Sequence, residues 1–288
     1  MHRSVDAHRT TRRCVKEKVV AALELTRPTN AGVGALGAAV GGYVGGSLGV
    51  PVAVAAVVTA FGTGAGNAVN DYYDADIDAV NRPDRPVPSG RISRRGAAFV
   101  SAALFAAALV LTVALLPLLA VGIGVVNLVV LVVYSSHLKR MPLVGNVAVA
   151  YLAGSAFLFG GAAAEGVRYT VVLFFLAGLV NLGREIVKDV EDVEGDAAEG
   201  ARTLPVVYGE RRAVLLATAS VLVAVGLSPA PYFVFDGFGT AYLVAVATAD
   251  VVLLEGVRRS WKSPSSGQKL LKTAMFVALV AFIAGRAV

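Results

Sequence analysis

Charged residues are scarce in this sequence. Asp, Glu, Lys and Arg make up 16% of the 288 residues, whereas soluble domains carry about 25%. Two stretches, residues 31–70 and 96–136, contain none of these four residue types. Each is long enough for two membrane-spanning helices of roughly 20 residues and a turn. With a mean hydropathy of +0.70, the sequence is typical of a multi-spanning membrane protein.

Cysteine and histidine are almost missing. Cys14 is the only cysteine, which excludes an intramolecular disulfide and a cysteine-ligated metal centre. The three histidines, His2, His8 and His137, are too few and too scattered for a histidine metal site. The net charge of +6 does not indicate a nucleic-acid partner, because membrane topology explains where the basic residues stand. Any metal site must therefore use acidic or amide side chains.

Apolar runs between charged loops predict an all-α fold of about nine transmembrane helices. We expect a basic cytoplasmic arm at residues 1–21 and a single transmembrane domain at 22–288. The sequence "SPAPYFVFDGFG" predicts the turn between the seventh and eighth spans. The predicted spans are 28–49, 52–76, 96–116, 118–136, 144–163, 168–187, 212–230, 238–256 and 268–286.

The basic residues predict how the chain is oriented. If the N-terminus is cytoplasmic, 24 of the 26 Lys and Arg residues fall on the cytoplasmic side, and only Arg168 and Arg286 fall outside. We therefore expect an integral protein of the cell membrane with a cytoplasmic N-terminus and an external C-terminus. Most acidic residues follow the basic ones to the cytoplasmic side, chiefly into the segments 70–95 and 184–212. The chemistry is expected at that face.

The first acidic motif is "NDYYDADID", residues 70–78, which directly follows an uncharged apolar run. On a continuous helix, three of its aspartates and two asparagines fall on one stripe, whereas Asp76 falls on the opposite side. The stripe consists of Asn67, Asn70, Asp71, Asp74 and Asp78.

The second acidic motif, "EIVKDVEDVEGD", repeats this spacing. Asp189, Asp192 and Asp196 lie 118 residues after their counterparts in the first motif. Carboxylate oxygens suit Mg²⁺, which binds through a few carboxylates and keeps ligand positions for substrate phosphates. Six facing acids would repel one another without such cations. A solvated acidic rim is the alternative, but a matched pair of motifs on one membrane side favours the metal site.

Basic residues near these motifs are candidate phosphate ligands. Arg82 and Arg85 stand in a loop stiffened by prolines, and the arginine fork matches phosphate oxygens. Metal, diphosphate and membrane together indicate a substrate with a phosphorylated head and an apolar tail. An allylic tail would leave a carbocation that needs a dry pocket with aromatic faces, for which Tyr134 is available. The full set of predicted phosphate ligands is Arg82, Arg85, Lys139, Arg140, Lys188 and Arg202.

On these motifs, the sequence resembles the UbiA family of intramembrane prenyltransferases. The pattern N-D-x2-D-x3-D at residues 70–78 and D-x3-D at 192–196 carries the resemblance, and "LTRPTN" and "YSSHLKRMPLVGN" are also similar to the family. The resemblance extends from about residue 22 to 287. It implies nine transmembrane helices around a central cavity with a cytoplasmic cap, and a substrate pocket that includes Arg27, Asn30, Asn67 and Tyr134. It also implies that Mg²⁺ and diphosphate bind at Asn70, Asp74, Asp78, Asp189, Asp192 and Asp196, and that Asp71 supports them.

Within the family, the sequence most resembles members that make archaeal ether lipids. Those enzymes join geranylgeranyl diphosphate to the free hydroxyl of geranylgeranylglyceryl phosphate. The resemblance thus implies a prenyl diphosphate donor and a lipid-phosphate acceptor, and Arg27, Lys188 and Arg202 are candidates for the acceptor phosphate. A quinone-precursor, haem or chlorophyll acceptor is the alternative. An ion-coupled transporter is the alternative from another class, although its acids would lie near the bilayer midplane.

Overall fold

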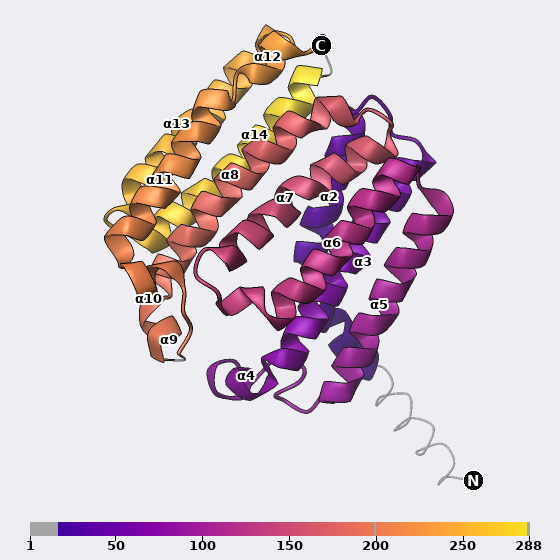
Figure 1. Cartoon of the computed structure of the whole chain (residues 1–288), viewed down its shortest axis with the longest axis vertical. Helices are drawn as coiled ribbons and strands as arrows, with labels where there is room; N and C mark the ends of the chain where they lie inside the picture. Colours follow the sequence, from indigo (N-terminus) through magenta and orange to yellow (C-terminus); the bar gives the residue numbers. More distant parts are fainter. Residues whose placement is uncertain (1–16, 199, 287–288) are drawn as a thin grey trace, which may run out of the picture.

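A computed structural model describes residues 17–198 and 200–286, and helices dominate these residues (Figure 1). Residues 17–26 are helical, and no strand occurs in the described ranges. The subsequent helices are α2 (Pro28–Val44), α3 (Val50–Tyr73), α4 (Ala75–Asn81), α5 (Arg94–Leu115), α6 (Leu118–Ser136), the 3₁₀ helix η1 (Leu138–Arg140), α7 (Val144–Ala163), α8 (Val167–Glu191), α9 (Val193–Ala198), α10 (Leu204–Tyr208), α11 (Glu210–Leu227), α12 (Ala230–Val234), α13 (Thr240–Ser260) and α14 (Pro264–Arg286).

The membrane fold predicted from the sequence is confirmed. Eight helical stretches are long and apolar enough to cross a membrane: α3, α5, α6, α7, α8, Glu210–Val234, α13 and α14. The first predicted span, 28–49, is too long, because α2 ends at Val44 after 17 residues. The predicted turn between the seventh and eighth spans contains the short helix α12. Nine spans is therefore an approximate count.

Local sequence signals explain where several helices begin and end. Pro28 stands in the first turn of α2 and Pro51 in that of α3, where a proline costs no intrahelical hydrogen bond. The hydroxyl of Ser93 caps α5 by accepting a hydrogen bond of 3.0 Å from the Gly96 amide. Gly46 ends the α2 segment with a φ of 101°, which favours glycine.

Glycines allow α2 and α7 to approach closely. A Cβ atom on Gly160 would lie 1.8 Å from the Ala38 carbonyl oxygen, and one on Gly41 would lie 2.1 Å from the Phe157 carbonyl oxygen. The Gly41, Gly42 and Gly45 positions all face close neighbours, as small residues at helix contacts do in membranes. Gly46 does not, since no atom lies within 4 Å of its Cβ position.

Helices that follow one another and helices that are distant in sequence both form the core. α2 packs against α3 and α7, α7 packs against α8, and α8 in turn packs against α11 and α14. The largest buried cluster joins α8, α11, α13 and α14 through side chains such as Ile186, Val221, Tyr242 and Leu271. A second cluster joins α3, α5, α6 and α7 around Phe159.

Both acidic motifs lie at the same end of the molecule. Figure 1 shows α4, α9 and α10 at one end and α12 at the other. Leu25, in the first helical segment, is buried with Ala68 and Ala97 at the end that carries the motifs. The loops that the sequence assigned to one membrane side are therefore together in space. Residues 1–16 of the predicted arm lie outside the described residues.

Candidate active site

The two acidic motifs share one local fold. Asp74 ends α3 and precedes α4, and Asp192 ends α8 and precedes α9. The backbone hydrogen bonds match: Asp74 N–H donates to Asn70 O at 2.8 Å, and Asp192 N–H donates to Lys188 O at 3.0 Å. Each motif thus breaks its helix at the middle aspartate, so the continuous helix assumed for the acidic stripe is wrong.

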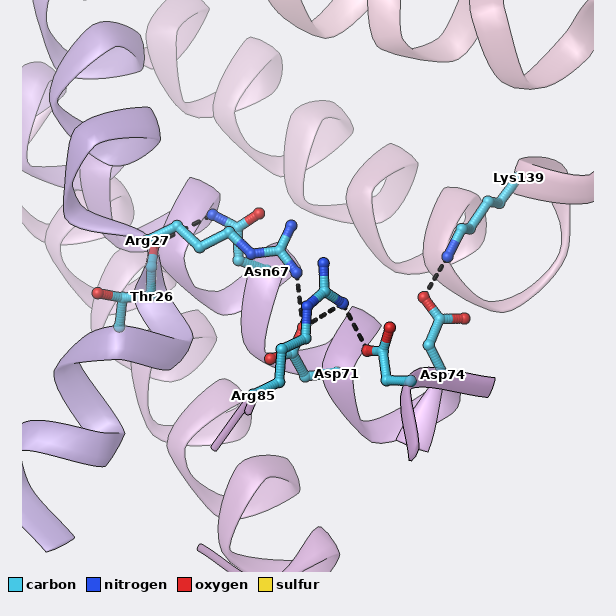
Figure 2. Close-up of polar contacts among 8 residues, drawn as sticks. Thr26, Arg27, Asn67, Asp71, Asp74, Arg85 and Lys139 are labelled. Carbon is cyan, nitrogen blue, oxygen red and sulfur yellow. Dashed lines mark hydrogen bonds and ion pairs between the residues drawn. The ribbon is translucent and has the colours of Figure 1, made fainter. Parts of the chain in front are cut away.

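In the first motif, arginines pair with the buried acids. Asp71 and Asp78 are only 2% and 6% exposed. Arg27 donates from Nη2 to Asp71 Oδ1 at 2.6 Å. Arg85 donates from Nη1 to Asp78 Oδ2 at 2.5 Å and lies 3.5 Å from Asp71 Oδ1, so it contacts both acids (Figure 2). The arginines offset the cost of placing carboxylates in a buried site.

The other two aspartates of the first motif, Asp74 and Asp76, pair with different basic residues. Lys139 of η1 forms an ion pair with Asp74 and approaches from another part of the chain (Figure 2). Asp76 forms an exposed ion pair with Arg94 at 3.2 Å. Asp76 is therefore separate from the other three, as the helical spacing predicted. Arg94 also lies over the Tyr72 ring, 5.1 Å from its centroid.

The second motif is held by amides. Asn146 of α7 donates from Nδ2 to Asp189 Oδ2 at 2.7 Å. Gln268 of α14 donates from Nε2 to Glu191 Oε2 at 3.1 Å. Asp192 is exposed and Asp196 is half-buried. Sequence reasoning assigned no role to either amide residue, because neither stands near an acidic motif in the chain, although Asn146 ends the quoted motif "YSSHLKRMPLVGN".

The predicted phosphate ligands fall into different groups. Arg85 and Lys139 lie among the acids of the first motif. Arg82, Lys188 and Arg202 are exposed. The side chain of Arg140 lies outside the described part. The described residues therefore bring two of the predicted phosphate ligands into contact with the acids, while three others present charge to solvent.

The carboxylate and amide oxygens of the two motifs are of the types that bind a hard divalent cation. The short helices α4 and α9 of the two motifs lie at one end of the molecule (Figure 1), and Asn70 Oδ1 is buried without a hydrogen-bond partner among the described residues. Oxygen ligands of these types suit Mg²⁺. Over the described ranges, no three His, Cys, Asp or Glu side chains converge on one point. In this arrangement, the first-motif acids contact basic side chains instead.

Two of the predicted pocket residues, Arg27 and Asn67, lie at the junction before α2. Arg27 has a left-handed backbone with a φ of 47°, which is rare for a residue with a side chain. Asn67 donates from Nδ2 to the Thr26 carbonyl oxygen at 3.0 Å and so holds this junction against α3 (Figure 2). Tyr134 is half-buried in α6, whereas Asn30 is exposed.

A cavity of about 70 Å³ lies deeper in the bundle. It is bounded by α3, α6 and α7, and its α3 wall stands about two helical turns from Asn70. Thr59, Thr63 and Asn127 are its polar members, and the other lining residues are apolar or glycine. Asn127 Oδ1 accepts a hydrogen bond of 2.6 Å from Ser155, which satisfies one polar group in the wall. The lining of the cavity is therefore mainly apolar.

Comparison with known proteins decides the family. The family described as UbiA prenyltransferase matches residues 31–280. The chain belongs to this family. The digeranylgeranylglyceryl phosphate synthase of Natronomonas pharaonis is 55% identical over 224 residues, which cover 77% of this chain and 80% of the relative. The enzyme of the same name from Methanopyrus kandleri is 46% identical over 268 residues, covering 91% and 97%.

Solved structures agree with this UbiA assignment. A structure described as one of digeranylgeranylglyceryl phosphate synthase in membranes is 37% identical, with a TM-score of 0.83 and coverage of 94% of this chain and 99% of that one. A UbiA homologue from Archaeoglobus fulgidus, bound to GPP and Mg²⁺, has the same fold at 19% identity and a TM-score of 0.67, covering 93% and 100%. This UbiA chain is therefore an integral membrane prenyltransferase of lipid biosynthesis, and the transporter alternative is set aside.

Proposed function

We propose that the enzyme transfers a geranylgeranyl group from geranylgeranyl diphosphate to the hydroxyl of geranylgeranylglyceryl phosphate. The observation that carries the proposal is the pair of acidic motifs, which share spacing and a helix break at one end of the bundle. The names and high identity of the relatives support this donor and acceptor. The Mg²⁺ and GPP bound by the Archaeoglobus fulgidus homologue support the metal and the diphosphate.

The proposed metal is Mg²⁺, held by the oxygen donors of both motifs. When bound, it supplies positive charge that stabilises the departing diphosphate. Asp71 is buried behind these donors and is paired with Arg27 and Arg85, so it supports the site from within. The metal ligands are Asn70, Asp74, Asp78, Asp189, Asp192 and Asp196.

The basic side chains bind phosphate oxygens in this scheme. Arg85 and Lys139 contact the acids, and their charged groups would be available to the diphosphate oxygens if the acids held the metal. Arg82 and Arg140 complete the donor diphosphate site. Lys188, Arg202 and Arg27 receive the acceptor phosphate.

The chemical step breaks the bond between the allylic carbon and the diphosphate oxygen, and the electron pair leaves with diphosphate. The acceptor hydroxyl oxygen then forms the ether bond to the allylic cation and loses its proton. The aromatic face of Tyr134 stabilises the cation. The mainly apolar lining between α3, α6 and α7 would favour the prenyl tail over water on that side of the site.

The membrane orientation belongs to the same proposal. The end that carries the acidic motifs faces the cytoplasm, where the charged substrates are dissolved or displayed, and the Arg286 end of α14 faces outward. This arrangement places 24 of the 26 basic residues on the cytoplasmic side.

A transfer assay tests the proposal. Membranes that contain the enzyme are incubated with radiolabelled geranylgeranyl diphosphate, Mg²⁺ and either geranylgeranylglyceryl phosphate or a hydroxybenzoate. We expect labelled diether phosphate that disappears with EDTA. Transfer to the hydroxybenzoate alone would replace the acceptor with the aromatic alternative. Folded enzyme without EDTA-sensitive transfer to either acceptor would refute the proposed reaction.

A further inference from the structure

One short segment contacts both acidic motifs. Residues 137–146 contain η1 and the start of α7. From this segment, Lys139 pairs with Asp74 of the first motif, and Asn146 donates to Asp189 of the second motif at 2.7 Å. The two contacts are only seven residues apart along the chain. We name residues 137–146 the bridging turn.

The bridging turn is tightly folded. Leu143 has a left-handed backbone with a φ of 64°, which costs energy for a residue with a side chain. A Cβ atom on Gly145 would lie 2.9 Å from the Leu138 carbonyl oxygen and 3.4 Å from that of Lys139. Only glycine fits there without displacing η1. The spacing between Lys139 and Asn146 is therefore set by the backbone.

Asn146 is placed to orient Asp189. Its side chain is buried, with 8% of the residue exposed, and a buried amide needs a partner. Asp189 forms no salt bridge with any residue that the structure describes, so the amide is the group that fixes its carboxylate. The bond engages Oδ2 and leaves Oδ1 available.

We propose that the bridging turn sets the separation of the two acidic motifs and that Asn146 is a positioning residue. Lys139 fixes Asp74 at one end of the turn, and Asn146 fixes Asp189 at the other. In the metal-bound enzyme, this bond keeps Asp189 oriented toward the cation, as hydrogen bonds to metal ligands do elsewhere. The orientation of Asp189 toward a cation rests on the proposed metal site. The control of the separation between the two motifs does not.

The chain offers a matched control. Gln268→Ala removes an amide-to-carboxylate hydrogen bond to the same helix, α8, at Glu191. That bond lies two residues from Asp189 and does not involve the bridging turn. If loss of a hydrogen bond simply loosened α8, both Gln268→Ala and Asn146→Ala would show the effect. If Asn146 positions Asp189, only Asn146→Ala would show it.

The separation of the motifs is measured without metal. In a Cys14→Ser background, spin labels are placed at residues 76 and 194 by Asp76→Cys and Glu194→Cys, because both positions are exposed. Double electron–electron resonance should give one narrow distance for the parent and for Gln268→Ala. We expect Asn146→Ala to broaden or shift this distance. An unchanged distance in folded Asn146→Ala would overturn the role of the turn.

A second variant covers the case in which Asn146→Ala does not fold. Lys139 has a side chain that is 36% exposed, so Lys139→Ala removes the other end of the bridge with little cost to packing. It should broaden the same distance. A narrow, unshifted distance in Lys139→Ala would contradict the proposal.

Metal binding tests the orientation of Asp189. Thermal stabilisation of the purified protein is titrated with Mg²⁺ and inorganic diphosphate. Loss of Asn146 should raise the half-maximal Mg²⁺ concentration about tenfold or more, while Gln268→Ala should leave it unchanged. An unchanged midpoint in Asn146→Ala would refute the orienting role. If Mg²⁺ does not stabilise the parent protein, the proposed metal site is refuted. The distance between the two labels then still tests whether the bridging turn sets the separation of the motifs.

Discussion

At the residue scale, the acids of the first motif differ in burial and in partner. Asp71 and Asp78 are buried against Arg27 and Arg85, whereas Asp76 is exposed and pairs with Arg94. Removing one partner of a buried pair leaves an uncompensated charge, which costs far more than breaking an exposed pair. Position along a helix predicted which acid stands apart, but it did not predict the arginine partners.

Arg27→Ala should therefore destabilise the protein markedly. The expected loss is about 2 kcal/mol, below the usual cost of breaking a buried pair because water reaches part of the Arg27 side chain. Asp76→Ala, which breaks an exposed pair, should cost less than about 1 kcal/mol. Thermal unfolding in detergent measures both variants. Equal melting temperatures for Arg27→Ala and Asp76→Ala would contradict the difference in burial between the two ion pairs.

At the element scale, the helix break at the middle aspartate is the main difference from the sequence-based prediction. The spacing of Asp71, Asp74 and Asp78 indicated a helix and a common face. It did not indicate that α3 stops at Tyr73 and α4 restarts at Ala75. At the break in the first motif, Lys139 pairs with Asp74 and Arg85 with Asp78, two tertiary contacts that the spacing of the acids does not reveal.

Long apolar helices were easier to predict than the contacts between them. The predicted spans 118–136 and 144–163 coincide with α6 and α7, since apolar runs, Pro117 and the basic segment between the two spans define them without tertiary information. Asn146 ends the family-like motif "YSSHLKRMPLVGN", but that motif does not show its partner, because an asparagine near a helix start has many possible partners. Its bond to Asp189 requires the α7–α8 packing to be known.

Gly160→Ala tests the close contact of α2 and α7. The added methyl would overlap the Ala38 carbonyl, so the helices must separate. We expect a loss of roughly 1–3 kcal/mol, as for other overpacked sites. Gly122→Ala in α6 is the control, because nothing lies within 4 Å of its Cβ position; it should leave the melting temperature unchanged or slightly raised. Similar melting temperatures in both variants would argue against this helix contact.

At the scale of the whole molecule, both acidic motifs and their basic partners lie at one end. The loop before α5, the bridging turn and the segment after α8 share this end, although they are distant in sequence. Basic residues favour the cytoplasmic side of a membrane, so we expect the bias that orients the protein also to place cations beside the acidic motifs.

Cysteine labelling in whole cells tests the orientation. In a Cys14→Ser background, Asp236→Cys, which lies at the α12 end, should react with a membrane-impermeant maleimide. Ser89→Cys, in the loop before α5, should react only after the membrane is permeabilised. Both positions are in loops, so access depends on the side of the membrane. The reverse labelling pattern would invert the proposed topology.

The most direct measurement of the central claim compares the two motifs in one assay. Mg²⁺-dependent transfer from geranylgeranyl diphosphate to geranylgeranylglyceryl phosphate is measured for Asp74→Asn, Asp192→Asn and Asp76→Asn, with expression and folding matched. If both motifs form one metal–diphosphate site, Asp74→Asn and Asp192→Asn should each lose at least about 100-fold in rate, while Asp76→Asn remains within about twofold of the parent. Full activity in folded Asp192→Asn would contradict a site built from both motifs.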